Sequence, residues 1–430
     1  MPGVAMVTIA GWIYKKREFG KKVFADLRVI SSRDYLGRIM QVVFDVSRMD
    51  AEEFRIIKKL GQESFIIVSG EFVENVRAPG GIELHVNKLL QYYPAEKPYP
   101  LAKKKHSPDF LLDMRHLTIR SPRYQRIWLI REALVDYLRE WYKNDGWVEV
   151  YPPILTFTAC EGGATLFALD YFGQEGYLSQ SAQLYLEVMI YSLGKVFSLT
   201  PSFRAEKSRT RRHLTEYWHF EAEAALYRFD DILKAQEEAL AYAIRKLLEN
   251  ERFYEWIKEF RGDTEILENI KPPFPRVTYD EAIRILQTKG VSIEWGDDLG
   301  ADEERILSEE FDTPFFVTMY PTEVKAFYVK AYENDERKCY SADMMAPEGY
   351  GEITTGGERE DRIDVLIERI KKEGFSPKNY YWYLDIRKYG SVPHSGFGLG
   401  IERTLMWILK LDHIREVIPF PRLARRKTLV

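Results

Sequence analysis

Five short runs of β-branched and aromatic residues fill the first ninety residues, and they constrain the fold of this chain more than any other feature. The runs are Val7–Tyr14, Lys22–Val29, Arg38–Phe44, Phe65–Phe72 and Ile82–Leu90. Runs of this kind, separated mostly by glycine-containing turns, predict strands. Between the third and fourth runs, apolar residues on one face predict a helix over Asp50–Leu60.

Five strands with a helix between the third and fourth are typical of an oligonucleotide-binding barrel, an all-β fold. Asp50 suits the N-cap of that helix, with Glu53 three residues later, and Gly61 suits its end. Residues 92–110 are rich in proline and lysine and lack periodicity, so we interpret them as part of a linker.

The hydrophobic period becomes helical from Pro122 onward, and strands then mix with helices without a regular βαβ alternation. We expect strands over Val196–Thr200 and Tyr217–Ala225, and helices over Asp230–Asn250, Ala301–Phe311, Asp361–Glu373 and Leu399–Leu411. This mixture predicts an α+β domain with a mainly antiparallel sheet flanked by helices. The expected division is a barrel over residues 1–95, a linker over 96–121 and a larger domain over 122–430.

The composition excludes several classes of protein. Of the 430 residues, 45% are hydrophobic and 30% charged, as in a soluble globular protein, and the net charge of -4 excludes a uniformly basic nucleic-acid coat. Only Cys160 and Cys339 are present, which excludes a disulfide framework and a cysteine-rich zinc site. With no signal peptide and no long apolar run, we expect a cytoplasmic protein that does not contact a membrane.

Two segments carry patterns that suit phosphate chemistry. Phe203-Arg204-Ala205-Glu206 begins a strongly basic loop that ends at His213-Leu214-Thr215-Glu216-Tyr217, and Gly396-Phe397-Gly398-Leu399-Gly400-Ile401-Glu402-Arg403 leads into an amphipathic helix. Arginine forks match phosphate oxygens, and glycines let a backbone approach a ligand closely. The glycine spacing differs from the dinucleotide-binding fingerprint. Taken singly, the segments are also compatible with a solvated loop and a structural turn.

The order of these segments, after a helix and a strand that ends at Pro153, resembles the class II aminoacyl-tRNA synthetases. Three further stretches, Cys160–Phe167, Leu178–Tyr185 and Thr200–Glu206, are similar to the aspartyl/asparaginyl subgroup, and most of all to its archaeal-type asparaginyl members. The resemblance covers nearly the whole chain. It implies a class II catalytic domain behind an anticodon-binding barrel, and a ligase that uses ATP to join L-asparagine to tRNA(Asn).

The resemblance also assigns the ATP-binding residues. Arg204 would bridge the α-phosphate and the substrate carboxylate, Glu206 would read the adenine amino group, and Tyr217 would stack on the adenine. Arg403 would contact the γ-phosphate, and His213 would lie near the tail phosphates. Arg204 and Arg403 are the candidate catalytic residues, because the reaction mainly requires stabilisation of charge on the α-phosphate.

Asp343 and Glu352 are the candidate Mg²⁺ ligands by the same resemblance. Mg²⁺ prefers oxygen ligands and usually needs only one or two carboxylates besides substrate phosphates. The spacing between the two acids is slightly longer than in aspartyl relatives, so Asp343 is the weaker candidate. The expected cofactors are ATP and Mg²⁺.

For the amino acid, the resemblance places Glu161 at the substrate α-amino group and Arg359 at its side chain. Ser181, Gln183 and Glu221 would line the same pocket. Aspartate-specific relatives carry a lysine where this chain has Leu186. Because a buried aspartate carboxylate without that cation would cost several kcal/mol, as an order of magnitude, we expect asparagine to be preferred.

In the barrel, Phe24 matches an aromatic residue on which an anticodon base stacks, and Gln41 matches a residue that reads the central uridine. Basic residues near the first turn, including Lys15 and Arg17, suit contacts with RNA phosphates. The alternatives for Phe24 and Gln41 are plain barrel core and a surface position on an edge strand.

The helix and strand that precede Pro153 form the dimer interface in this family, so we expect a homodimer. Three rival functions remain at this point: an aspartate–tRNA ligase of relaxed specificity, an asparagine synthetase built on the same catalytic core, and a non-catalytic RNA-binding module. The intact barrel weighs against the second, and the presence of Arg204, Glu206, Glu352 and Arg403 weighs against the third.

Overall fold

The computed structural model describes residues 6–101, 105–160, 165–207, 210–424 and 426–427. Met1–Leu129 and Ile130–Lys427 form two compact units, each with its own core. Within the described residues, no helix is long and apolar enough to cross a membrane.

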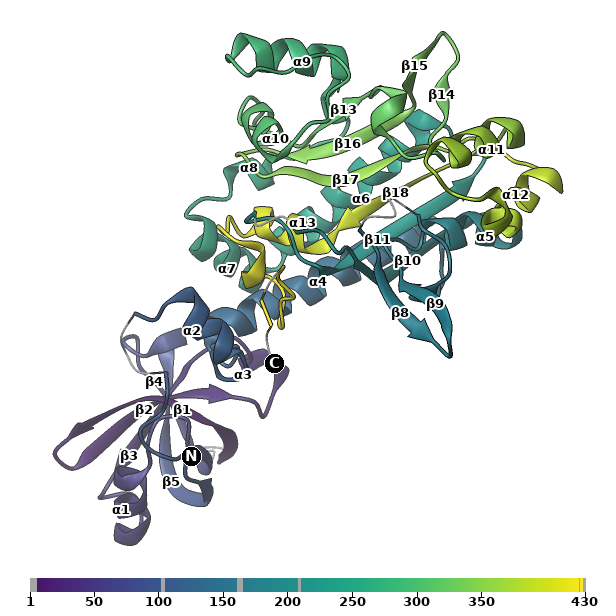
Figure 1. Ribbon diagram of the computed structural model, residues 1–430. Coiled ribbons are helices and arrows are strands. Elements are labelled where there is room, and N and C mark those ends of the chain that lie inside the picture. The colour runs from purple at the N-terminus through teal and green to yellow at the C-terminus, as the bar shows by residue number, and fades with distance from the viewer. Residues whose placement is uncertain (1–5, 102–104, 161–164, 208–209, 425, 428–430) are drawn as a thin grey trace. The chain divides into compact units, whose positions relative to one another are not determined.

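The first unit is built on a closed barrel with the strand order β1-β2-β3-β5-β4, which confirms the predicted all-β barrel (Figure 1). Its elements are β1 (Val7–Phe19), β2 (Lys22–Val29), β3 (Met40–Asp45), α1 (Ala51–Lys59), β4 (Phe65–Glu74) and β5 (Ile82–Tyr93). Among the described strands of the barrel, β3 and β5 pair in parallel and the other neighbours are antiparallel. Alternate residues of β2, including Val23, Ala25 and Leu27, are buried in the barrel core. Asp50 caps α1 as expected, because its side chain accepts from two backbone amides.

Two short helices, α2 (Pro108–Asp113) and α3 (Arg115–Thr118), lie in the stretch that the sequence predicted to be a linker. Ser107 caps α2 through its hydroxyl, and Pro108 occupies the first helical position. This serine–proline pair is a recognised helix-start signal. The apolar stretch behind it is too short for its period to be detected.

The second unit contains a mixed eight-stranded sheet that is mainly antiparallel, in agreement with the predicted α+β class. In spatial order its strands are β12 (Arg276–Thr278), β13 (Phe315–Thr318), β16 (Ser341–Ala346), β17 (Gly351–Glu358), β18 (His394–Gly400), β11 (Glu216–Ala225), β10 (Lys195–Phe203) and β6 (Val148–Glu149). Two small sheets join β7 (Leu155–Thr156), β9 (Gln174–Leu178) and β8 (Phe167–Tyr171), and β14 (Ala331–Tyr332) with β15 (Asp335–Cys339).

The remaining helices pack in part against this sheet and in part against one another. They are α4 (Pro122–Asn144), α5 (Gln183–Leu193), α6 (Phe229–Glu249), α7 (Glu251–Arg261), α8 (Glu265–Glu268), α9 (Tyr279–Thr288), α10 (Ala301–Ser308), α11 (Ile363–Lys372), α12 (Tyr381–Lys388) and α13 (Ile401–Ile408). Helix α5 packs on β11 and β10, α6 on β17 and β18, and α13 on β11. The glycine-rich segment differs from expectation, because its glycines form the central strand β18 and the helix begins only at Ile401.

Candidate active site

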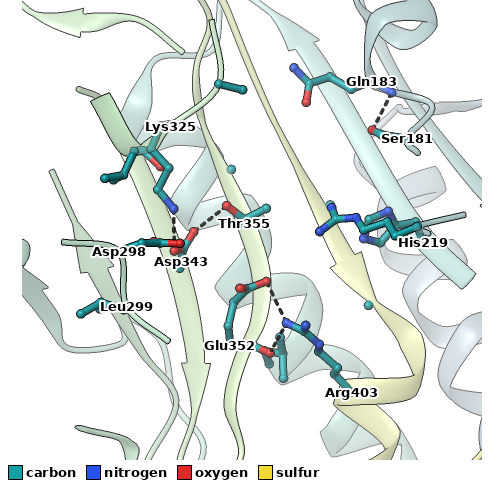
Figure 2. Close-up of a pocket in the computed structure, with 18 of the residues that line it drawn as sticks. Ser181, Gln183, His219, Asp298, Leu299, Lys325, Asp343, Glu352, Thr355 and Arg403 are labelled. Atoms are coloured by element: carbon teal, nitrogen blue, oxygen red, sulfur yellow. Dashed lines mark hydrogen bonds and ion pairs between the residues drawn. The ribbon is translucent and has the colours of Figure 1, made fainter. Parts of the chain in front are cut away.

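One pocket of about 760 Å³ over the central strands brings most of the candidate residues together (Figure 2). Its lining includes Ser181, Gln183, Arg204, Glu206, His213, Tyr217, Glu221, Asp343, Glu352, Arg359 and Arg403. Glu161 lies outside the described residues. Phe24 and Gln41 belong to the barrel unit.

Three residues of β11 line the pocket, because side chains alternate between the two faces of a strand. Residues two apart on a strand face the same side, and on β11 these are Tyr217, His219, Glu221 and Glu223. The last three stand opposite Gly400, Gly398 and Gly396 of β18. A Cβ atom on Gly396 would lie 2.0 Å from the Glu223 carboxyl group. The absence of a side chain at Gly396 therefore leaves room for the Glu223 carboxyl group.

Arg204 follows β10 directly and is fixed by a backbone hydrogen bond from its N–H to the carbonyl of Thr215, 3.0 Å. Its guanidinium lies 5.9 Å from the centre of the Tyr217 ring. The Glu206 carboxylate oxygens lie 3.9 Å from Arg204 Nη1 and 3.6 Å from His213 Nε2. Burial, together with Arg403, lowers the pKa of His213, so Arg204 is the cation of this pair of neighbours. This end of the pocket offers cations for phosphate and an aromatic face for a base.

His219 lies behind Tyr217, with the two rings edge to face at 4.8 Å between centres. Burial, together with Arg204 and Arg403, lowers the pKa of His219 to about 3. Its Nδ1 lies 3.0 Å from the hydroxyl of Ser202. The imidazole is therefore neutral at physiological pH and adds no charge to the cationic end.

Arg403, in the first turn of α13, holds Glu352 of β17 from across the pocket. Its Nη1 lies 3.1 Å from Glu352 Oε1 and donates to the Glu352 carbonyl at 3.3 Å. Burial raises the pKa of Glu352, but Arg403 and Lys325 oppose burial and lower it overall. An ionised carboxylate thus stands beside the arginine that would meet the ATP tail.

Asp343 of β16 is already engaged by neighbouring donors. Lys325 Nζ donates to its Oδ2 at 2.7 Å, and the Thr355 hydroxyl donates to its Oδ1. The described residues contain no group of three or more His, Cys, Asp or Glu side chains that could hold a metal. An ion that needs one carboxylate and substrate phosphates fits Glu352, whereas Asp343 carries a lysine as its counter-ion.

At the other end of the pocket, Glu221 accepts from the Ser181 hydroxyl and, at 2.8 Å, from the N–H of Ala182. The N–H of Gln183 donates to the Ser181 oxygen at 3.1 Å, so the start of α5 is tied to β11 (Figure 2). Carboxylate and amide oxygens gather here, and such acceptors suit an ammonium group.

Arg359 reaches the same end from beyond β17 and is only 3% exposed. It donates to the Glu223 carboxylate through Nε, 3.1 Å to Oε1, and through Nη2. Burial disfavours the charge on Arg359, but Glu223 more than offsets burial and raises its pKa. The guanidinium is held in one plane, which suits recognition of a planar carboxyl or carboxamide group.

Leu186 does not line the pocket in the described part of the chain. It is fully buried with Ala182, Ile190 and Val196. The place that holds a lysine in aspartate-specific relatives is therefore apolar core here.

A second group of candidate residues lies on the outer face of the barrel. Phe24 is half-buried and alternates with the core residues of β2, so it does not belong to the barrel core. Gln41 is 8% exposed, accepts from Arg17 Nη2 at 3.0 Å and donates to Glu83 Oε2 at 2.6 Å. It lies on β3, which is paired on both sides and is not an edge strand.

Several pocket residues have no counterpart among the predicted ones. They include Arg212, His219, Asp298, Glu304 and Lys325. Arg212 belongs to the basic loop, but it ties that loop to α10 by donating to Glu304 Oε2 at 2.7 Å. Lys325 and Asp298 stand in segments without a local pattern, so only the tertiary fold brings them into the pocket.

Comparisons with known proteins agree with this geometry. The family of class II tRNA synthetases (D, K and N) matches residues 107–424, and the OB-fold nucleic acid binding domain matches residues 7–91. The chain is 56% identical over 421 residues to the asparagine–tRNA ligase of Pyrococcus abyssi, covering 98% of this chain and 95% of that protein. It is 45% identical over 420 residues to the asparagine–tRNA ligase of Desulforamulus reducens, with coverage of 98% and 96%.

Solved structures give the same picture. The asparaginyl-tRNA synthetase of Pyrococcus horikoshii complexed with asparaginyl-adenylate has a TM-score of 0.94 and 54% identity, covering 99% of this chain and 96% of that one. The aspartyl-tRNA synthetase of Entamoeba histolytica has a TM-score of 0.81 and 26% identity, covering 99% and 90%. The similarity is thus greater to this asparaginyl enzyme than to this aspartyl one.

Proposed function

The chain belongs to the class II tRNA synthetases of the D, K and N group, and from this premise we propose that it is an asparagine–tRNA ligase. It activates L-asparagine with ATP and transfers the asparaginyl group to tRNA(Asn). The observation that carries the proposal is a single pocket with two chemically distinct ends, one cationic around Arg204 and Arg403 and one rich in acceptors around Glu221. The first end suits ATP, and the second suits an amino acid.

At the ATP end, Arg204 neutralises charge on the α-phosphate and the attacking carboxylate. Tyr217 provides the stacking face for adenine, and Glu206 accepts from the adenine amino group. His213 and Arg403 meet the outer phosphates. Each role stabilises or orients the reacting groups, which is the main contribution a protein makes to phosphoryl chemistry.

We further propose that Glu352 and Asp343 are the protein ligands of Mg²⁺. When bound, Mg²⁺ neutralises charge on the phosphates. Glu352 is the better placed ligand, because Asp343 is paired with Lys325. The ion pair with Lys325 therefore limits the rotation of the Asp343 side chain toward a metal.

At the amino-acid end, Ser181, Gln183 and Glu221 surround the α-amino group, and Glu161 contributes from outside the described residues. Arg359 donates to the side-chain oxygen of the substrate. A neutral carboxamide is favoured over a carboxylate, because Leu186 provides no cation and the Glu221 carboxylate, which accepts from Ser181 and Ala182, would repel a second carboxylate.

The barrel unit binds the anticodon through Phe24 and Gln41. Phe24 supports this role because it lies outside the core of the barrel, and Gln41 because its amide is held in place by Arg17 and Glu83. Base stacking on an aromatic side chain contributes about 1–3 kcal/mol.

The protein acts as a homodimer in the cytoplasm. Large apolar side chains are exposed on and around β6, β7 and β8, in the region that follows α4, which supports a subunit interface. They include Val148, Tyr151, Ile154, Leu155, Phe157 and Phe172, and the last is 91% exposed. Light scattering at micromolar concentration tests the dimer, and a monomeric mass contradicts it.

ATP–pyrophosphate exchange without tRNA tests the proposed activity. Exchange is expected with asparagine, and with aspartate only at a far lower rate. Equal exchange with both amino acids contradicts the specificity, and no exchange with either contradicts the activity. A variant with Arg204→Gln serves as the inactive control.

A further inference from the structure

A charged cluster lies buried in α5, α12 and β18, next to the amino-acid end of the pocket. Its centre is Glu187, in the second turn of α5, which is fully buried. Helical geometry places Glu187 one turn after Gln183, on the same face. Gln183 lines the pocket, whereas Glu187 does not. The cluster has no part in the chemistry described above.

The two oxygens of Glu187 have different partners. Oε2 accepts from Tyr383 Oη at 2.7 Å and from Arg387 Nη2, and it lies 2.9 Å from His394 Nε2. Oε1 accepts from Gln183 Nε2 at 3.0 Å. Tyr383 and His394 are fully buried, and Arg387 is 5% exposed. Burial disfavours the charge on Glu187, but Arg387 and His394 outweigh burial and lower its pKa.

This arrangement determines which way the Gln183 amide faces. A glutamine side chain has a donor end and an acceptor end, and an ionised carboxylate can only accept. Glu187 therefore holds the NH₂ group of Gln183 and leaves its Oε1 for the pocket. An acceptor in that place suits the ammonium group of an amino acid, and an NH₂ group would repel it.

We propose that Glu187 is a positioning residue for amino-acid binding, which holds Gln183 with its carbonyl oxygen toward the α-amino group of the substrate. The inference rests on the proposed function, because it assigns an amino acid to this end of the pocket. Glu187 acts through Gln183 and touches no substrate.

The variant Glu187→Gln is expected to reverse the orientation of the Gln183 side-chain amide. Tyr383, Arg387 and His394 hold the oxygen of the new carboxamide, so its NH₂ group faces position 183. Gln183 must then accept, and it presents its own NH₂ group to the pocket. In pyrophosphate exchange the KM for asparagine should rise about 10- to 100-fold, as for the loss of a hydrogen bond to a charged group, while the KM for ATP stays within about twofold.

A second variant exchanges the two side chains and so restores a hydrogen-bond acceptor that faces the substrate. In Gln183→Glu with Glu187→Gln, the carboxylate at 183 accepts from the amide at 187 and turns its other oxygen toward the substrate. Its KM for asparagine should return to within a few-fold of the wild-type value. The matched control is Tyr383→Phe, which removes a buried hydrogen bond to Glu187 Oε2 and leaves the Gln183 contact in place. Its KM for asparagine should stay within about twofold, even if its unfolding temperature falls.

An unchanged KM for asparagine in Glu187→Gln overturns the proposal, and so does an equal rise in both KM values. If Glu187→Gln does not fold, the exchanged pair is compared with Gln183→Glu alone, and equal KM values for asparagine in these two variants overturn it. A wild-type protein that shows no exchange with asparagine instead contradicts the proposed function.

Discussion

Arg403 Nη1 lies 3.1 Å from Glu352 Oε1 and also donates to the backbone carbonyl of the same residue. The glycine-rich strand β18 and the helix α13 that follows it thus fix an arginine against β17. This contact connects the last motif of the chain to the candidate metal ligand.

Replacing Arg403 tests its role at the phosphates. Arg403→Gln should lower kcat/KM for pyrophosphate exchange about 10²- to 10³-fold, because a fixed donor to developing charge is lost. The matched control is Arg337→Gln, on the exposed hairpin of β14 and β15, where the arginine pairs with Asp335 at the surface. If both variants keep wild-type kcat/KM, Arg403 has no role in catalysis.

The pair formed by Glu223 and Arg359 should matter for stability as well as for binding. Glu223→Ala leaves a buried guanidinium without its partner, which costs about 3–5 kcal/mol of unfolding free energy. Glu249→Ala removes an acid from an exposed pair on α6 and should cost less than about 1 kcal/mol. Urea unfolding measures both, and equal losses contradict the importance of the buried pair.

His219 should make stability depend on pH. Its pKa is about 3 when folded and 6.5 as the reference value, so the unfolded chain binds more protons between these limits and stability falls as pH drops below 6.5. Between pH 7 and pH 4.5 the loss from this residue is about 2–3 kcal/mol. In His219→Asn, which keeps a polar group toward Ser202, the fall in unfolding free energy should be smaller by that amount. An identical pH profile in both proteins contradicts the assignment.

Phe24 should affect tRNA and not amino-acid activation. Phe24→Ala should lower kcat/KM for tRNA charging about 5- to 150-fold, corresponding to the loss of one base stack. Pyrophosphate exchange should be unchanged, because it takes place in the other unit. The control is Phe19→Ala, whose exposed side chain lies in edge contact with the half-buried Phe24. Loss of exchange together with charging contradicts the anticodon role.

Local patterns in the sequence were enough to predict the barrel strands, the helix α1 and the hairpin of β10 and β11. The segment Gly396–Gly400 was harder to interpret, because glycines give no strand signal. In the fold these residues form the strand β18. Glycine is required at position 396 because the Glu223 carboxyl group occupies the space that a side chain there would need. The physical reason lies on the neighbouring strand and cannot be read from the segment itself.

The site residues also divide into those that a local sequence pattern predicts and those that only the tertiary fold brings together. The arginines of the two motifs could be predicted because their spacing is distinctive. Lys325 and Asp298, by contrast, reach the pocket from segments that belong to neither motif. Glu187 shows the limit most clearly. A single acid in an apolar helix gives no sign of its partners, because Arg387 and His394 follow about 200 residues later.

Charging of tRNA with labelled amino acids tests the central claim most directly. Asparagine and aspartate are compared in parallel, each with and without tRNA(Asn), at equal enzyme and ATP concentrations. The account predicts that asparagine alone becomes attached to tRNA. Attachment of aspartate at a comparable rate, or formation of free asparagine from aspartate and ammonia without tRNA, would contradict it.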